Sequence, residues 1–206
     1  MALAWIPHTE PPRLRHADQA LATLLERGET ALGPVISELE AELARRLGRQ
    51  WAVAVDSGSS ALMLAIRALG LRRVGVPAFA CTAVAIAARN AGAAITWLDV
   101  DDRLCAQTKA GQPFVLVHPF GYLDPRAERL SGVWIEDVAT AAGGRLGNRP
   151  CGSFGTLAVG SLYATKPWGG AMGGFVAGND PELEARVRAM TTSDRDTLPD
   201  HYAGPH

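Results

Sequence analysis

The chain has 206 residues and a formal net charge of −1, and it is 48% hydrophobic and 20% charged. This ordinary globular composition can bury one substantial core, while the near-zero charge gives no electrostatic basis for binding nucleic acid. No apolar run is long enough to cross a membrane, and the N-terminus lacks a basic segment followed by an apolar core. With three cysteines that show no metal-ligand spacing, these features favour a cytoplasmic protein with reduced thiols and no membrane partner.

Residues 1–33 are predicted to form a proline-punctuated arm and one helix. The helical pattern covers residues 16–28, where three leucines share one face. A stronger helix opens the main domain, because apolar residues recur every four positions until Gly48 ends it. We expect this domain to span residues 34–190 and residues 191–206 to form a polar tail.

Short apolar strands then alternate with helices or short crossovers. The predicted strands cover Trp51–Val55, Val74–Val76, Ile95–Leu98, Phe114–Val117, Val133–Ile135, Thr156–Leu162 and Gly174–Ala177. Helices are predicted after each of the first two strands and over Pro181–Met190, with a short one over Pro125–Leu130. Strands joined in this way favour an α/β fold, in which a mostly parallel sheet is covered on both faces.

The stretch Ser57–Ser60 joins the first strand to a helix. The first N–H groups of a helix have no partner within it, and the helix dipole adds partial positive charge there. Gly58 permits a tight turn, and the serine hydroxyls add hydrogen-bond donors. Together these groups predict a phosphate site. The alternative, which the stretch taken alone favours, is an ordinary serine N-cap.

Lys166 lies among small and hydroxylated residues between two apolar strands. Crowding there would desolvate its ammonium, so we expect a lowered pKa and a nucleophilic amine. Such a lysine suits Schiff-base chemistry with an aldehyde or ketone, and Ser161, Tyr163 and Thr165 supply hydroxyls nearby. The alternative is a loop lysine in a glycine-rich turn.

Polar groups gather at the predicted carboxyl ends of strands, where open α/β sheets bind ligands. Besides Ser57–Ser60, His118 follows the fourth strand, and Asp137 follows the fifth. Pyridoxal 5'-phosphate needs a lysine for a Schiff base, a helix N-terminus for its phosphate, and a carboxylate that keeps its pyridine nitrogen protonated. The chain offers all three.

The sequence resembles the DegT/DnrJ/EryC1/StrS family of pyridoxal-phosphate aminotransferases over residues 6–190. The motifs that carry the resemblance are LGPVISELEAELARRLG, AVAVDSGSSALMLAIRALG, VPAFACTAVAIAARNAGAAITWLDVD, VHPFG, IEDVATAAGG, and GSFG followed by SLYATKPWGGAMGGFVAGND. The resemblance implies the three-layer large domain of the fold type I (aspartate aminotransferase-like) enzymes, with the small C-terminal domain of that fold absent or vestigial. It also implies a homodimer, with the proline-rich arm at residues 5–12 lying on the neighbouring subunit.

The resemblance assigns roles by position. Lys166 is implied to be the Schiff-base lysine and the proton shuttle. Asp137 is implied to pair with the pyridinium nitrogen, and Glu136 beside it is the alternative carboxylate. Gly58 and Ser59 are implied to hold the phosphate.

Further positions either match the family pattern or depart from it. Ser161 is implied to bind the phosphate, although it could merely bond to the backbone. Cys81 stands where the family has an aromatic side chain stacked on the cofactor ring, and Thr140 stands where a glutamine touches the cofactor's phenolic oxygen. Met172 replaces a glutamate, and His118 is expected to be a packed loop histidine. The connections over residues 102–113 and 123–132 are shorter than is usual.

The activity implied by the resemblance is transamination in polysaccharide biosynthesis. An amino group would pass from an amino acid, glutamate being expected, to a keto acceptor, expected to be a nucleotide-linked keto sugar. Lysine at position 166 argues against the family's dehydratase branch, which has histidine there. Family members continue into a small C-terminal domain that completes the substrate cleft. One alternative is therefore a truncated or non-catalytic homologue that binds the cofactor, and another is a generic α/β protein that binds a phosphate ligand.

Overall fold

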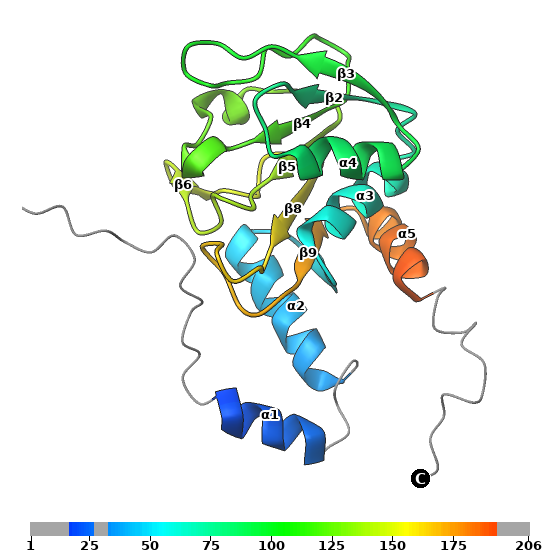
Figure 1. The fold of residues 1–206 in the computed structure, drawn as a ribbon, viewed down its shortest axis with the longest axis vertical. Coiled ribbons are helices and arrows are strands. Elements are labelled where there is room, and N and C mark those ends of the chain that lie inside the picture. Colours follow the sequence, from blue (N-terminus) through cyan, green and yellow to red (C-terminus); the bar gives the residue numbers. More distant parts are fainter. Residues whose placement is uncertain (1–16, 27–32, 193–206) are drawn as a thin grey trace, which may run out of the picture.

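The computed structural model describes residues 17–26 and 33–192, and its centre is a seven-stranded sheet with the order β1-β9-β8-β5-β4-β2-β3 (Figure 1). The strands are β1 (Trp51–Val55), β2 (Arg73–Pro77), β3 (Ala94–Leu98), β4 (Phe114–Val117), β5 (Trp134–Asp137), β8 (Leu157–Ser161) and β9 (Gly174–Gly178). Every neighbouring pair from β8 to β3 is parallel, whereas β9 is antiparallel to both of its neighbours, β1 and β8. The expected mostly parallel α/β fold is confirmed.

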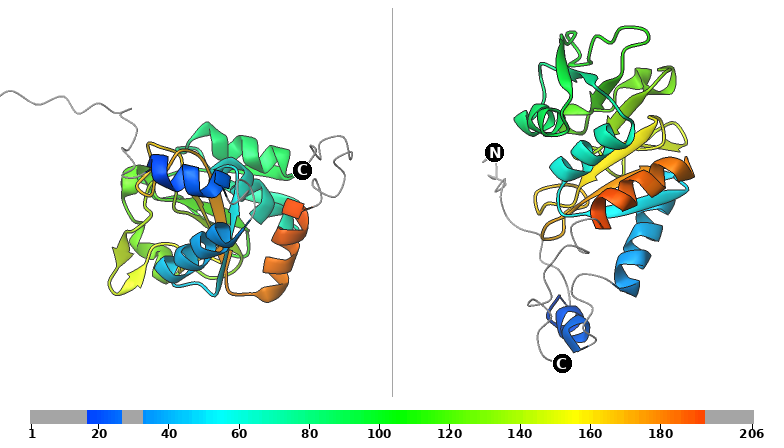
Figure 2. Two further views of the ribbon diagram at one scale, coloured as in Figure 1. Left: turned by 90° about the horizontal axis from the view of Figure 1, so that it is seen from below. Right: turned by 90° about the vertical axis from the view of Figure 1, so that its right-hand side faces the viewer.

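Helices cover both faces of this sheet and make three layers (Figure 2). The α-helices are α1 (Ala17–Glu26), α2 (Pro34–Leu47), α3 (Gly58–Ala68), α4 (Thr82–Asn90) and α5 (Pro181–Thr192). Helices α3, α4 and α5 pack on one face, and α2 packs on the other. Helix α2 ends where predicted, because Gly48 adopts the left-handed conformation (φ 65°) and donates its N–H to the Arg45 carbonyl. Within the described part of the chain, no helix is both long and apolar enough to cross a membrane.

Successive strand residues alternate between two cores. On the α3 side, Val115, Ile135 and Val159 join the large cluster beneath α3, α4 and α5. On the opposite side, Ala158 and Phe175 pack against α2. Each strand of this half of the sheet is therefore apolar on both sides, as a sheet covered on both faces requires.

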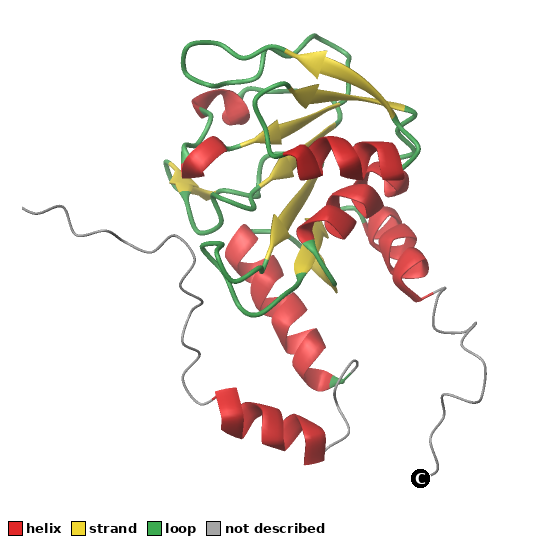
Figure 3. Ribbon diagram, in the orientation of Figure 1, coloured by secondary structure: helices red, strands yellow, loops and turns green. Residues whose placement is uncertain are grey.

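Around β2, β3 and β4, none of the described α-helices packs on the face of the sheet that α2 covers elsewhere. Loops and two short 3-10 helices, η1 (Pro119–Gly121) and η2 (Pro125–Glu128), lie there instead (Figure 3). Phe114 and Trp134 stack beneath them with ring centroids 5.7 Å apart. The short connections noted in the sequence are thus sufficient to cover this face, and η2 corresponds to the short helix predicted near residues 125–130.

The structure contains one element that the sequence did not predict, and two predicted segments lie outside the described residues. The hairpin β6 (Arg145–Leu146) and β7 (Arg149–Pro150) was not predicted, because two-residue strands carry no periodic pattern. The proline-rich arm and residues 193–206 lie outside the described residues. The domain boundaries stay a prediction, although α5 continues to Thr192, two residues beyond the expected end of the main domain.

The free edge of β1 is closed by side chains rather than by another strand. Glu40 of α2 accepts a hydrogen bond from the Ala54 N–H at 2.9 Å. Arg188 of α5 pairs with Glu40 at 3.0 Å and donates to the Ala52 carbonyl at 3.4 Å. Backbone groups on an exposed edge can pair with another chain, and here the Ala54 N–H and the Ala52 carbonyl are occupied.

Replacing Glu40 should therefore destabilise the fold. In Glu40→Ala the Ala54 N–H loses its acceptor and the Arg188 guanidinium loses one of its two carboxylate contacts, so we expect the free energy of unfolding to fall by about 1–3 kcal/mol. Urea denaturation followed by circular dichroism measures it. Glu38→Ala, an exposed glutamate of the same helix, is the control and should change stability by less than about 0.5 kcal/mol. Equal effects of both substitutions would contradict the edge-closing role.

Candidate active site

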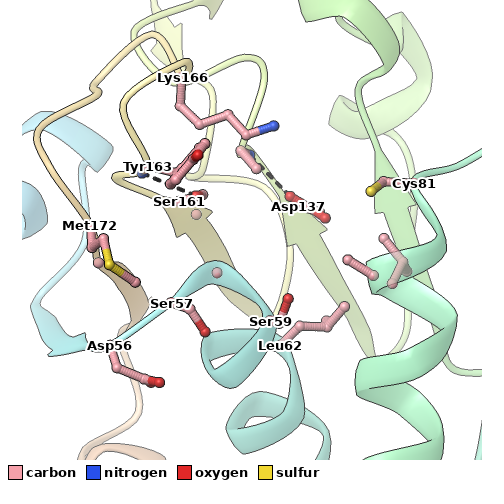
Figure 4. A pocket seen from close by; sticks show the side chains of 16 residues that line it. Asp56, Ser57, Ser59, Leu62, Cys81, Asp137, Ser161, Tyr163, Lys166 and Met172 are labelled. Atoms are coloured by element: carbon pink, nitrogen blue, oxygen red, sulfur yellow. Dashed lines mark hydrogen bonds between the residues drawn. The ribbon is translucent and has the colours of Figure 1, made fainter. Parts of the chain in front are cut away.

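A cavity of about 280 Å³ lies at the carboxyl ends of β1, β5 and β8, beside the first turn of α3 (Figure 4). Of the seven residues that the sequence predicts for the site, six line this cavity: Gly58, Ser59, Cys81, Asp137, Ser161 and Lys166. The structure thus brings together residues that are more than 100 positions apart in the chain. The exception is Thr140.

The first turn of α3 forms one wall of the cavity. Ser57 is its N-cap, and its Oγ accepts a hydrogen bond from the Ser60 N–H at 3.1 Å. The N–H groups of Gly58 and Ser59 come earlier in the helix and have no intrahelical carbonyl to donate to. A Cβ on Gly58 would lie 2.9 Å from the Cβ of Ser161, so glycine permits this close approach of α3 to the end of β8. The serine cap and the predicted anion site are therefore compatible.

Asp137 and Glu136 lie on opposite faces of the sheet because they are neighbours on strand β5. Asp137 has the same orientation as Ile135, faces the α3 side and lines the cavity. Glu136 is fully buried on the other side, where the N–H groups of Gly152 and Phe154 donate to its carboxylate at 2.6 and 2.8 Å. Of the two carboxylates, Asp137 is the one available to a ligand in the cavity.

Burial raises the pKa of Asp137 above its ordinary value. The N–H of Ala139 donates to Oδ1 at 3.0 Å and, with the positive charge of Lys166, opposes this increase only in part. Desolvation penalises the charged form of a carboxylate, and a nearby cation restores it. A ligand that places a protonated nitrogen beside Asp137 would therefore stabilise the carboxylate.

Lys166 is half-buried in the loop between β8 and β9, and its side chain extends into the cavity toward the side on which Asp137 lies (Figure 4). Its N–H donates to the Tyr163 carbonyl at 2.8 Å, and its carbonyl accepts from the Gly169 N–H at 2.8 Å. A Cβ on Gly169 would lie 2.6 Å from the Ala164 carbonyl oxygen, so this turn requires glycine. The turn fixes the backbone from which the lysine extends.

The remaining predicted residues differ in how directly they face the cavity. Ser161 Oγ accepts from the Tyr163 N–H at 3.2 Å, so its hydroxyl proton can still be donated to a ligand. Cys81 is exposed at the N-cap of α4 and lines the cavity. Thr140 donates its hydroxyl to the His118 carbonyl at 2.6 Å and is not among the described residues that line the cavity.

His118, Glu136 and Cys151 form a buried cluster whose polar atoms lie within 4.8 Å of one another. The Asp124 N–H donates to Nδ1 of His118 at 3.2 Å, so Nε2 carries the proton that faces Glu136 Oε1 at 3.4 Å. Burial and the Glu136 charge raise the pKa of Cys151 strongly, and its thiol lies 3.5 Å from Oε1. Because Nδ1 of His118 and both carboxylate oxygens of Glu136 already accept hydrogen bonds from backbone N–H groups, we interpret this cluster as a hydrogen-bonded anchor. His118 is packed, as expected.

Hydrogen bonding also determines the ionisation of Glu136. Burial alone would raise its pKa, but hydrogen bonds from His118 and from the N–H groups of Gly152 and Phe154 lower the pKa below its ordinary value. A carboxylate held in this way joins β5 to the segment after β7. The cluster thus supports the end of β5 from the face opposite the cavity.

Asp56, Tyr163 and Met172 are among the residues that line the cavity without having been predicted as site residues. Asp56 directly follows β1, and the strand-end position that drew attention to Asp137 could also have identified it. Tyr163 and Met172 are 53% and 74% exposed, and both lie on the loop that carries Lys166. Their proximity to Lys166 in the sequence was the available signal.

The chain matches a family model, described as the DegT/DnrJ/EryC1/StrS aminotransferase family, over residues 14–110 and 122–202. It is 34% identical to a UDP-N-acetyl-3-dehydro-alpha-D-glucosamine 3-aminotransferase of Acidithiobacillus ferrooxidans, over 82% of this chain and 51% of the relative. It is 30% identical to a UDP-4-amino-4-deoxy-L-arabinose–oxoglutarate aminotransferase of Shewanella sediminis, over 92% of this chain and 53% of the relative.

A solved structure agrees with these relatives. The crystal structure of Streptomyces venezuelae DesV in complex with a ketimine intermediate superposes with a TM-score of 0.76 and 32% identity, over 85% of this chain and 52% of that one. The chain spans about half the length of the relatives it matches. The family match covers most of the chain, and the resemblance inferred from the motifs is confirmed: the chain belongs to the DegT/DnrJ/EryC1/StrS aminotransferase family.

Proposed function

We propose that this chain binds pyridoxal 5'-phosphate and transfers an amino group from an amino acid to the keto group of a nucleotide-linked sugar. The observation that carries the proposal is the convergence of Lys166, Asp137 and the first turn of α3 on one cavity. Membership of an aminotransferase family supports the reaction class. A cytoplasmic role in polysaccharide biosynthesis remains a prediction from the sequence.

The polar groups of the cavity fit those of the cofactor. Glycine at position 58 lets α3 approach Ser161 closely, so the N–H groups of Gly58 and Ser59 and the Ser161 hydroxyl lie near one another and would hold the phosphate. Asp137, whose pKa is raised by burial, would pair with the ring nitrogen. Among the described residues that line the cavity, Lys166 is the single cation, so the remaining positive charge would come from the helix N-terminus and the ligand.

Each residue then has a defined task. When bound, pyridoxal phosphate supplies an aldehyde that condenses with an amine and a ring that accepts electrons. Lys166 would provide the amine at Nζ, and the same Nζ would accept and return a proton during the reaction. Asp137 holds the proton on the ring nitrogen. The cradle at Gly58 orients the ring, because fixing the phosphate fixes one end of the molecule.

The names of the relatives support the choice of substrates. One is named as acting on a UDP-linked 3-dehydro sugar, and another pairs an amino sugar with oxoglutarate. Oxoglutarate is the keto acid that glutamate becomes when it gives up its amino group. We therefore propose glutamate as donor and a nucleotide-linked keto sugar as acceptor.

A second candidate function is cofactor binding without efficient turnover. Cys81 lines the cavity where the resemblance leads us to expect an aromatic ring. The Thr140 hydroxyl donates to the His118 carbonyl and does not line the cavity. Met172 is 74% exposed and offers no carboxylate. We expect these three departures from the family pattern to leave cofactor binding in place but to slow the turnover of keto sugars. A third candidate, a generic protein that binds a phosphate ligand, would not explain why Lys166 and Asp137 both line the cavity.

We also propose that the chain forms a homodimer that covers the mouth of the cavity. Tyr163 and Met172 are largely exposed there, and Leu21 and Leu25 of α1 are 56% and 59% exposed. Exposed apolar side chains at each of these two places are typical of association surfaces.

The proposed function predicts a covalent bond between Lys166 and the cofactor. The protein mixed with pyridoxal phosphate should show a visible absorption band, and borohydride should convert it to a covalent adduct that peptide mass spectrometry finds on Lys166. Lys166→Ala should abolish both the band and the adduct at the active site. Lys109→Ala, an exposed lysine outside the cavity, is the control and should change neither. A wild-type protein without a band would contradict the proposed function.

The second prediction separates the two neighbouring carboxylates. Asp137→Asn should still bind the cofactor but slow the half-reaction with glutamate by about 3 kcal/mol in barrier, roughly a hundredfold, because a preorganised charge is lost. Glu136→Gln should instead lower thermal stability, because Glu136 accepts hydrogen bonds from buried N–H groups. Single-turnover absorbance changes and thermal melts measure the two effects. The opposite pattern would exchange the two assignments.

The third prediction concerns assembly. Light scattering at micromolar concentration, with cofactor bound, should give twice the mass of one chain. Replacing the exposed Leu21 and Leu25 with serine should weaken the dimer without changing the melting temperature of the main domain. A monomeric wild-type protein that retains its cofactor would count against the proposed dimer.

A further inference from the structure

We propose that Trp168 is a positioning residue that fixes the loop carrying Lys166 by anchoring it on helix α2, across the sheet from the cavity. The anchoring is a property of the fold. Its consequence for cofactor binding rests on the proposed function.

The loop between β8 and β9 has few side chains that can hold it in place. Its backbone is closed by hydrogen bonds from the Leu162 N–H to the Gly173 carbonyl and from the Gly170 N–H to the Leu162 carbonyl, both 2.9 Å. Most of its side chains are exposed or small, namely Tyr163, Ala164, Thr165, Pro167, Ala171 and Met172. Among the described residues of this loop, Leu162 and Trp168 are the two that pack against a hydrophobic cluster.

Trp168 contacts three separate segments on the α2 side. Its ring lies 6.1 Å from that of Phe175 on β9, and the Arg46 guanidinium of α2 lies 5.9 Å above it. A Cβ on Gly143 would approach Nε1 of Trp168 to 3.2 Å, so the turn that follows Asp137 also touches this ring. One side chain thus joins α2, β9 and the Asp137 segment to the loop.

The position of Trp168 is transmitted to Lys166 by a tight turn. The Gly169 N–H donates to the Lys166 carbonyl at 2.8 Å, which encloses Trp168 between the two ends of the turn. A Cβ on Gly169 would meet the carbonyls of Ala164 and Lys166 at 2.6 and 2.8 Å, so the backbone there has little freedom. The Trp168 ring, held on the α2 side of the sheet, therefore fixes the direction in which the Lys166 side chain extends into the cavity on the α3 side.

Hydrogen exchange tests the anchor on the protein without cofactor. The reporters are the amides of Lys166, Gly169 and Gly170, which all donate within the loop. In Trp168→Ala these amides should exchange about tenfold faster or more, because the loop opens locally while the sheet stays folded. Trp168→Phe keeps a ring against Phe175 and Arg46 and should stay within about threefold of wild type. Trp97→Ala, 61% exposed on strand β3, is the matched tryptophan control and should leave the three amides unchanged.

Cofactor binding provides the second measurement. Trp168→Ala should weaken the affinity for pyridoxal phosphate and slow borohydride-trappable adduct formation on Lys166 by about tenfold or more, because a misplaced reacting group loses much of its rate. Trp168→Phe should recover most of both. Arg46→Ala should show a smaller loosening of the loop amides, since it removes only the cation above the ring.

The outcomes separate the anchor from the proposed function. Loop amides that exchange as slowly in Trp168→Ala as in wild type would overturn the anchor, whatever the cofactor does. Faster exchange in a protein whose wild type forms no adduct would support the anchor and contradict the proposed function. If Trp168→Ala does not fold, Trp168→Leu carries the same comparison, with loop amides expected to exchange at least about threefold faster than in wild type while those of β5 stay protected.

Discussion

The alternation of side chains across the sheet is the constraint on which the candidate site depends. Strands β5 and β8 end at the same edge, and on each of them every second residue faces α3. This geometry places Asp137 and Ser161 in the cavity and Glu136 in the opposite core. A one-residue shift of β5 would exchange the two carboxylates and leave a buried anchor where a ligand should bind.

The parts of the fold that could be predicted are those with a local signal. The strands and helices follow from apolar periodicity, and the anion site follows from serines at a helix start next to Gly58. Lys166 was identified because it is a charged residue between two apolar strands, and Asp137 because it ends one. The family motifs then related these positions to one another before any contact between them was known.

The parts that could not be predicted depend on contacts between distant segments. Thr140 lies only three residues from Asp137, yet its hydroxyl bonds to the His118 carbonyl on a neighbouring strand end. Cys151 shows no metal-ligand spacing, but folding brings its thiol to Glu136. Trp168 carries no signal of its own in the sequence, and its contacts with Arg46 and Phe175 are formed only by folding. Such relations need the tertiary structure.

The closed edge of β1 has a consequence for how copies of this chain can meet. Because Glu40 binds the Ala54 N–H and Arg188 binds the Ala52 carbonyl, a strand added at that edge would have to displace both side chains. The proposed dimer would therefore use side-chain surfaces, whose shape and chemistry are particular to the partner, rather than backbone groups that every protein shares. The exposed side chains of Tyr163 and Met172 beside the cavity offer one such surface.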